Sequence, residues 1–168
     1  MRLGSRLVVG AIAGLVGTMA MTSTMRRLHK RLPEGQRYPL PPREIVNATV
    51  DAPDEAAKDL TIAAHFAYGA GCGALLAVAN PRIGRFTGAA AGSAIWLASY
   101  MGWIPAFDIL KPATGHPARR NALMIVSHFA WGWATAEAMR ELAKARETIF
   151  AAGEDRDAKD APSSPRRS

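Results

Sequence analysis

Four long stretches of the chain contain no Asp, Glu, Lys or Arg, and they cover residues 7–25, 60–81, 86–107 and 121–136. All 21 basic and 14 acidic residues lie outside them. A helix that crosses the hydrocarbon core of a bilayer needs about 20 mainly apolar residues. The fourth stretch reaches that length when it extends to residue 139, with the flanking charged side chains directed to the interface. A soluble helical bundle would instead show charged faces at helical spacing, and none recurs in these stretches.

We therefore predict an all-α fold, a four-helix transmembrane bundle in contact with the lipid bilayer, with spans at 7–25, 60–81, 86–107 and 121–139. Residues 1–146 form the membrane domain, and 147–168 form a polar tail that we expect to be disordered. Only residues 81–85 link the second and third spans, which predicts a tight antiparallel hairpin between them. The proline-rich segment before residue 43 predicts a short interfacial helix over 43–50.

The composition argues against several classes of function. The net charge is +7, but the basic residues flank the spans without an aromatic-interleaved patch, so no nucleic-acid partner is expected. Cys72 is the only cysteine and lies inside a span, which excludes a disulfide framework and a paired-cysteine metal motif. The sequence contains no P-loop, nucleophile elbow, dinucleotide fingerprint or zinc-protease motif, so we predict that the protein is not an enzyme.

One pentapeptide occurs twice with a single aromatic exchange: residues 65–69 are His-Phe-Ala-Tyr-Gly and residues 128–132 are His-Phe-Ala-Trp-Gly. Upstream of each copy lies a Gly-x-x-x-Gly segment, at 10–14 and 88–92, followed by a proline and an acidic residue. The repeated order predicts two parallel hairpin repeats, related by a pseudo-two-fold axis along the membrane normal.

Glycines at this spacing let helix backbones approach closely, within the chain or in a homo-oligomer. The pairs predicted to act in helix packing are Gly10 and Gly14, Gly69 and Gly73, and Gly88 and Gly92.

The repeated histidines are the candidate functional residues. His65 shares a helix face with Tyr68, and His128 shares one with Trp131. A histidine at membrane depth needs a hydrogen-bond partner and usually faces the bundle interior or a water-filled cavity. The simplest hypothesis is that each imidazole bridges helices and fixes their packing.

Two functional alternatives stay open. The histidines are suited to relay protons, with Glu44 and Asp108 at the mouth, because imidazole titrates near neutral pH. Alternatively, His65 and His128 bind a haem or a transition metal in an electron-transfer component. No cofactor is expected under the first hypothesis.

The turn at 39–43 (Pro-Leu-Pro-Pro-Arg), the two histidine segments and the Met-Gly-Trp-Ile-Pro run at 101–105 resemble the YagU-like family of small bacterial inner-membrane proteins, a domain of unknown function. The resemblance runs from the first span to residue 146. It implies a multi-pass bacterial inner-membrane protein with cytoplasmic termini and a link to acid resistance. Family members with a longer first loop have cysteines there, and this chain has none. The family supplies no catalytic residues.

Overall fold

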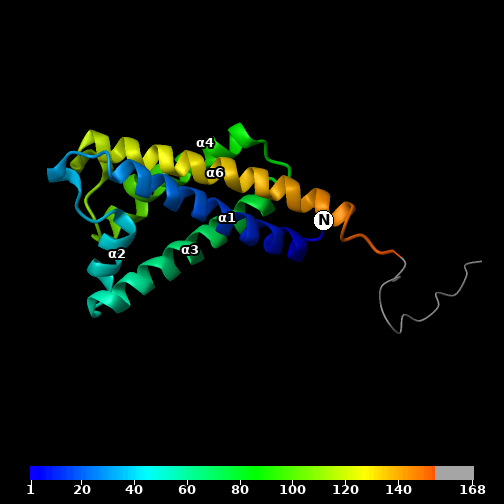
Figure 1. Ribbon diagram of the computed structural model, residues 1–168, viewed down its shortest axis with the longest axis horizontal. Helices are drawn as coiled ribbons and strands as arrows, with labels where there is room; N and C mark the ends of the chain where they lie inside the picture. The colour runs from blue at the N-terminus through cyan, green and yellow to red at the C-terminus, as the bar shows by residue number, and fades with distance from the viewer. Residues whose placement is uncertain (154–168) are drawn as a thin grey trace, which may run out of the picture.

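The computed structural model describes residues 1–153, and this part of the chain is helical without any strand, which confirms the predicted all-α class (Figure 1). The elements in chain order are α1 (Leu3–His29), the 3₁₀ turn η1 (Glu34–Gln36), α2 (Pro41–Thr49), α3 (Asp54–Ala79), α4 (Arg85–Ala98), the π-helical segment η2 (Ser99–Trp103), α5 (Ile104–Ala106), the 3₁₀ turn η3 (Ala113–Gly115) and α6 (Ala118–Glu147).

Local sequence explains where these helices begin and end. Pro41 occupies the first turn of α2, where its missing N–H costs nothing. Asp54 and Glu55 open α3, where carboxylates are favourable at the positive end of the helix dipole. Arg26 and Arg27 lie in the last turn of α1, where cations are favourable at the negative end of the helix dipole.

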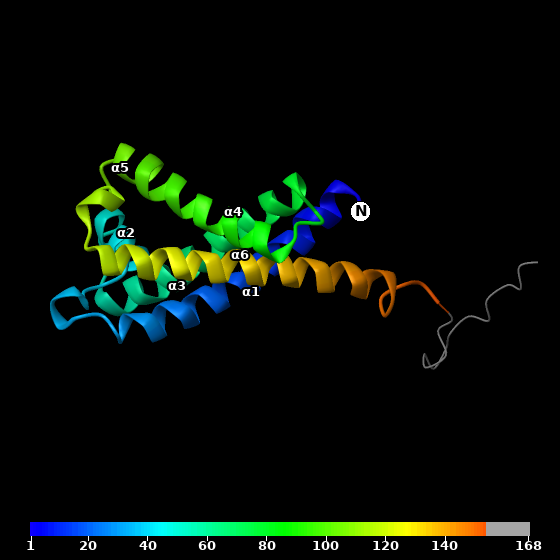
Figure 2. The ribbon, with the colours of Figure 1, turned by 90° about the horizontal axis from the view of Figure 1, so that it is seen from above.

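The four long helices are arranged in the spatial order α3, α1, α6, α4. α1 packs along both α3 and α6, and α6 packs along α4 (Figure 1). The predicted hairpin between the second and third spans is wrong, because α3 and α4 diverge after the link at 80–84 and make little contact with each other. Figure 2 shows α4 leaning away from the rest of the molecule toward the end that carries α5. The two outer helices therefore leave a space between them that is closed at one end by α2.

Glycines hold α1 against α3, as predicted. A Cβ atom on Gly10 would lie 2.5 Å from the carbonyl oxygen of Gly73, and a Cβ on Gly14 would collide with the carbonyl oxygen of Gly69. A Cβ on Gly73 would in turn lie 2.7 Å from Cα of Gly14. These obstacles are backbone atoms that cannot turn aside, so the close approach of the two helices requires glycine.

The second Gly-x-x-x-Gly segment brings α4 close to α6 in the same way. Relative to the repeated histidine, its contacts lie one helical turn away from those of the first segment. A Cβ on Gly88 would lie 2.6 Å from the carbonyl oxygen of Gly132, and a Cβ on Gly92 would collide with that of His128. In the first repeat, Gly14 faces the carbonyl oxygen of Gly69, which is four residues after His65. In the second repeat, Gly92 faces the carbonyl oxygen of His128 itself. The two halves thus share one kind of contact in different registers.

The helix that contains α4 changes its winding before it ends. Pro105 lacks an N–H and its ring clashes with the carbonyl one turn earlier in a regular helix. The chain responds with the π-helical segment η2, inside which Gly102 leaves helical geometry with φ −113° and ψ −107°. This wider turn directs Ser99, Tyr100 and Trp103 toward the space beside α3.

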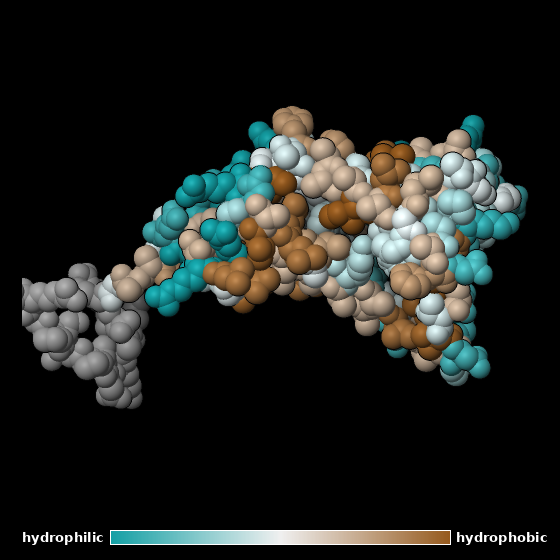
Figure 3. All heavy atoms as spheres, turned by 180° about the vertical axis from the view of Figure 1, so that it is seen from behind, coloured by the Kyte–Doolittle hydropathy of each residue, from teal (hydrophilic) through white to brown (hydrophobic). Residues whose placement is uncertain are grey.

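Apolar side chains cover much of the outer surface. By length and composition, α1 and α3 are long and apolar enough to cross a membrane. Large apolar residues are exposed on all four long helices, for example Val16 on α1, Leu75 on α3, Leu97 on α4 and Val126 on α6. In Figure 3 the hydrophobic residues extend over the middle of the molecule and the most hydrophilic ones gather toward its ends.

In the described part of the C-terminal region, α6 continues to Glu147 and is followed by a turn over residues 148–150. Most of the tail that we predicted to be disordered, residues 154–168, lies outside the described residues.

Candidate functional site

An apolar cavity of about 270 Å³ lies between α3 and α4, at the end of the molecule that carries α2. Its walls come from α1, α2, α3, α4 with η2, α5 and α6, so segments from most of the described chain converge on it. None of its lining residues is Asp, Glu, Lys or Arg. The cavity is therefore a neutral chamber with aromatic walls.

The structure brings both candidate histidines to this cavity. His65 reaches it from α3 and His128 from α6. The Nδ1 atom of His128 lies 2.8 Å from the carbonyl oxygen of Met124, one turn earlier in its own helix. The Nε2 atom of His65 is buried and has no hydrogen-bond partner among the described residues. Neither imidazole forms a hydrogen bond to a different helix within residues 1–153, so the geometry does not favour the helix-bridging hypothesis.

The residues predicted to share a face with these histidines have different surroundings. The hydroxyl of Tyr68 lies 3.1 Å from Oγ of Ser99, so it connects α3 to η2 across the cavity rim. Trp131 is almost fully buried in the core and also lines the cavity. Cys72 lines the cavity one turn beyond Tyr68 and is partly exposed.

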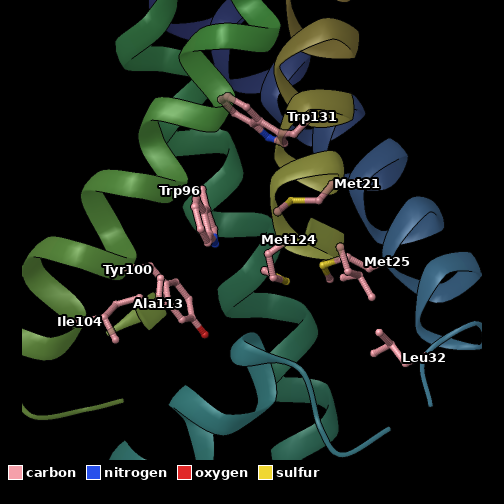
Figure 4. Packing of buried hydrophobic residues seen from close by; sticks show 10 residues of the cluster. Met21, Met25, Leu32, Trp96, Tyr100, Ile104, Ala113, Met124 and Trp131 are labelled. Carbon is pink, nitrogen blue, oxygen red and sulfur yellow. The ribbon is translucent and has the colours of Figure 1, made fainter. Parts of the chain in front are cut away.

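Two aromatic residues that the sequence analysis missed complete the site. Trp96 and Tyr100 are buried, and their rings stack with centroids 5.8 Å apart. The Trp96 indole nitrogen and the Tyr100 hydroxyl are both buried without a hydrogen-bond partner in the described chain. Figure 4 shows these two polar atoms directed away from α4 toward the interior. The sequence signal for this pair was its spacing of four residues in an uncharged helix, which places both rings on one helix face. The same pattern is equally typical of ordinary core packing, so it did not identify a site.

α2 closes the cavity with Ile45 and Val46, and two ionic contacts hold it there. Arg43 forms an ion pair of 2.7 Å with Asp54 at the start of α3. Hydrogen bonds from Lys58 and Arg43 lower the pKa of Asp54, so this carboxylate stays ionised.

The second contact centres on Arg120, whose side chain is buried at the start of α6. It donates hydrogen bonds to the carbonyl oxygens of Gln36 (3.0 Å), Tyr38 (3.0 Å) and Pro39 (2.7 Å). Its guanidinium lies 3.5 Å from the centre of the Tyr38 ring and 3.7 Å from a carboxylate oxygen of Glu44. Sequence reasoning missed Arg120 because an arginine beside a span is normally a solvated interfacial charge.

The two predicted acidic residues have different surroundings. Glu44 lies on α2 beside Arg120 and outside the lining of the cavity. Asp108 is exposed in the turn after α5, with a φ of +54°, and is likewise not a lining residue. The sequence predicts both acids at the mouth of the histidine pair; neither acid lines the cavity, and Asp108 is exposed.

The lining residues with atoms that can bind a metal are His65, His128, Cys72, Met21 and Met124. Residues 1–153 contain no cluster of three or more His, Cys, Asp or Glu side chains arranged to bind a metal ion. The cavity volume of about 270 Å³ is also below the range of about 300–1,000 Å³ that is typical of small-molecule pockets. A haem would need α3 and α4 to move apart.

Comparison with known proteins supplies no relative for this arrangement: no family model, curated protein or solved structure matches the chain.

Proposed function

We propose that this chain is a multi-pass protein of the bacterial inner membrane, non-enzymatic, whose functional centre is the cavity lined by His65 and His128. In this proposal four segments cross the bilayer: α1, α3, the run from α4 through η2 to α5 with its kink at Gly102, and α6. Apolar residues exposed on all four support this, because water would penalise such a surface and lipid would not.

Aromatic side chains at two levels give independent support. Phe86 and Trp133 pack edge to face near the start of α4, with Arg85 over the Trp133 ring. Trp103 and Phe107 are exposed at the other end of the same helical run. At 1.5 Å per residue the helical path between the two levels is about 30 Å long, which is enough to cross a hydrocarbon core. Aromatic belts of this kind occur at membrane interfaces.

A protonatable centre is the role of the histidines that the geometry supports best. The observation that carries it is that two imidazoles from different helices line one neutral cavity without bonding to another helix. A histidine that fixes helix packing would form a hydrogen bond to another helix through a ring nitrogen. These two keep at least one nitrogen each for a proton or a ligand.

The resemblance to the YagU-like family supports placing this centre in envelope or acid-stress physiology, with cytoplasmic termini. In that orientation α2 and the loop after α5 face the periplasm. The cavity then lies closest to the side from which external acid arrives.

The test is proton flux into vesicles that contain the purified protein, with acid survival of cells measured in parallel. We expect His65→Gln to lower flux and survival while the folded yield stays at the wild-type level. His29→Gln is the matched control, because His29 lies outside the cavity and the amide can still bond to the Tyr38 carbonyl. Wild-type flux together with a reduced folded yield would assign His65 a structural role instead.

The second candidate function is haem or metal binding for electron transfer, favoured by the convergence of His65 and His128 on one cavity. The visible spectrum and metal content of the protein purified in mild detergent decide it. A stoichiometric Soret band that disappears in His65→Ala and His128→Ala replaces the proposed function with this one. A colourless, metal-free protein removes the candidate.

A further inference from the structure

The polar groups without partners around the cavity indicate what the cavity binds. The indole N–H of Trp96 can only donate a hydrogen bond. The hydroxyl of Tyr100 and Nε2 of His65 are also able to donate, and all three atoms are buried without a partner in the described residues. A buried donor that finds no acceptor costs about 1–3 kcal/mol. A ligand that brings acceptors would recover this cost.

The positions of the three groups restrict that ligand further. His65 is on the α3 wall, whereas Trp96 and Tyr100 are on the opposite wall formed by α4 and η2. A ligand that satisfies both walls carries acceptors on two opposite edges. The stacked rings of Trp96 and Tyr100 offer an aromatic surface to a flat ring between them and α3.

Charge and volume exclude other common membrane ligands. With no lysine or arginine in its lining, the cavity has no permanent cation to pair with a phosphate or carboxylate head group. An acyl chain would leave the donors unsatisfied. About 270 Å³ accommodates a single ring with small substituents, so a longer tail has to leave the cavity.

A tail would leave the cavity through the rim between α3 and α4, where the Tyr68 hydroxyl now bonds to Ser99. α3 and α4 make little contact, and the rim between them is formed by Tyr68 and Trp103, whose ring centroids are 6.4 Å apart and whose side chains are exposed. Under the proposed membrane topology this rim faces the acyl chains of the lipids.

We propose that the cavity binds the head group of a membrane-soluble quinone, with its two carbonyl oxygens accepting hydrogen bonds from His65 on one side and from Trp96 and Tyr100 on the other. This inference rests on the proposed function, because it assumes that the rim opens to the bilayer. It concerns binding only and requires no electron transfer.

Quenching of tryptophan fluorescence tests the proposal, since three of the four tryptophans line the cavity. The probe is a fully substituted benzoquinone with a decyl tail, titrated into the full-length protein in mild detergent. We expect saturable quenching at one quinone per chain. Trp96→Phe keeps a ring but loses the donor, and Tyr100→Phe loses the hydroxyl, so each should weaken binding about tenfold. Trp133→Phe, outside the cavity, should leave the affinity unchanged.

A second measurement uses the wild-type protein and does not depend on any variant folding. Cys72 lines the cavity, so bound quinone should slow its labelling by N-ethylmaleimide at least tenfold, and decylbenzene, which lacks the two oxygens, should slow it far less. Equal protection by decylbenzene would mean that the site takes any acyl-like chain, and that overturns the proposal. Non-saturable quenching, or wild-type affinity in Trp96→Phe, also overturns it.

The two proposals fail in different experiments. A protein that conducts protons through His65 but does not bind the quinone keeps the proposed function and loses only this inference. A protein that is not embedded in the membrane loses both.

Discussion

Single glycines set the separation of the helix pairs. Gly73 is buried between α3 and α1, where an added Cβ would lie 2.7 Å from Cα and 2.8 Å from the nitrogen of Gly14. Gly71, two residues earlier in the same helix, faces open space. The two positions share a helix and differ only in what they face.

We expect Gly73→Ala to lower the free energy of unfolding by about 1–3 kcal/mol, because α1 and α3 have to separate to accept the methyl group. Gly71→Ala should have no effect or stabilise by about 0.5–1 kcal/mol, because alanine is the better helix former. Thermal or denaturant unfolding in mild detergent measures both. Equal effects would contradict the backbone contact between α1 and α3.

Arg120 is the residue on which the position of α2 depends most. Its side chain is only 4% exposed, and it satisfies three carbonyl oxygens of the segment before α2. Its neighbour Arg119 is exposed.

Arg120→Ala should cost about 3 kcal/mol, because three carbonyl groups lose a charged donor and Glu44 loses its counter-charge. Hydrogen exchange of residues 34–50 should accelerate in this variant more than exchange elsewhere. Arg119→Ala is the control and should leave the exchange unchanged. Uniform acceleration over the whole chain would show that Arg120 has no special role for α2.

The outer surface of each helix indicates its surroundings. Val16 on α1 is 49% exposed and Val50 just after α2 is 42% exposed, so the two valines differ little in burial. Val16 lies in the middle of a proposed span, whereas Val50 lies in the loop before α3.

Val16→Arg should cost about 2.5–3.5 kcal/mol of membrane insertion, because an arginine at the centre of a span enters hydrocarbon. Val50→Arg should be neutral. The amount of protein that resists alkaline carbonate extraction from membranes measures the difference. Equal recovery of both variants would mean that α1 lies in water, and the membrane proposal would fail.

At the scale of the whole molecule, the number of crossings decides which ends share a side. α1 and α3 alone would give two crossings, and the loop after α5 would then lie on the same side as the N-terminus. Four crossings put that loop with the segment between α1 and α2. Thr114 therefore distinguishes the two topologies.

We expect single cysteines at Gly35 and Thr114, introduced into a Cys72→Ala background, to react with a membrane-impermeant maleimide added outside cells. Cysteines at Gly4 and Gly84 should react only after lysis. The three glycines face open space, so the substitutions do not disturb packing. Thr114 reacting together with Gly84 would reduce the number of crossings to two.

Sequence by itself determined the helical class and the glycine contacts, and it singled out two histidines that the structure brings to one cavity. These follow from local rules: charge-free length sets the helices, and Gly-x-x-x-Gly spacing sets the close approach of α1 to α3 and of α4 to α6. The short helix predicted over 43–50 from the prolines before it is α2, which the structure places at Pro41–Thr49.

Tertiary structure alone decided that α3 and α4 separate, and the cavity exists because they do. The glycine contacts bind each outer helix to an inner one, so the chain order of α3 and α4 does not make them neighbours. The tertiary structure also gave Trp96, Tyr100 and Arg120 their roles. Whether a buried polar atom has a hydrogen-bond partner depends on groups that are tens of residues away in the sequence. Asp108 shows the same dependence: its spacing from His128 matched that of Glu44 from His65, but it is exposed in the turn after α5 and does not line the cavity.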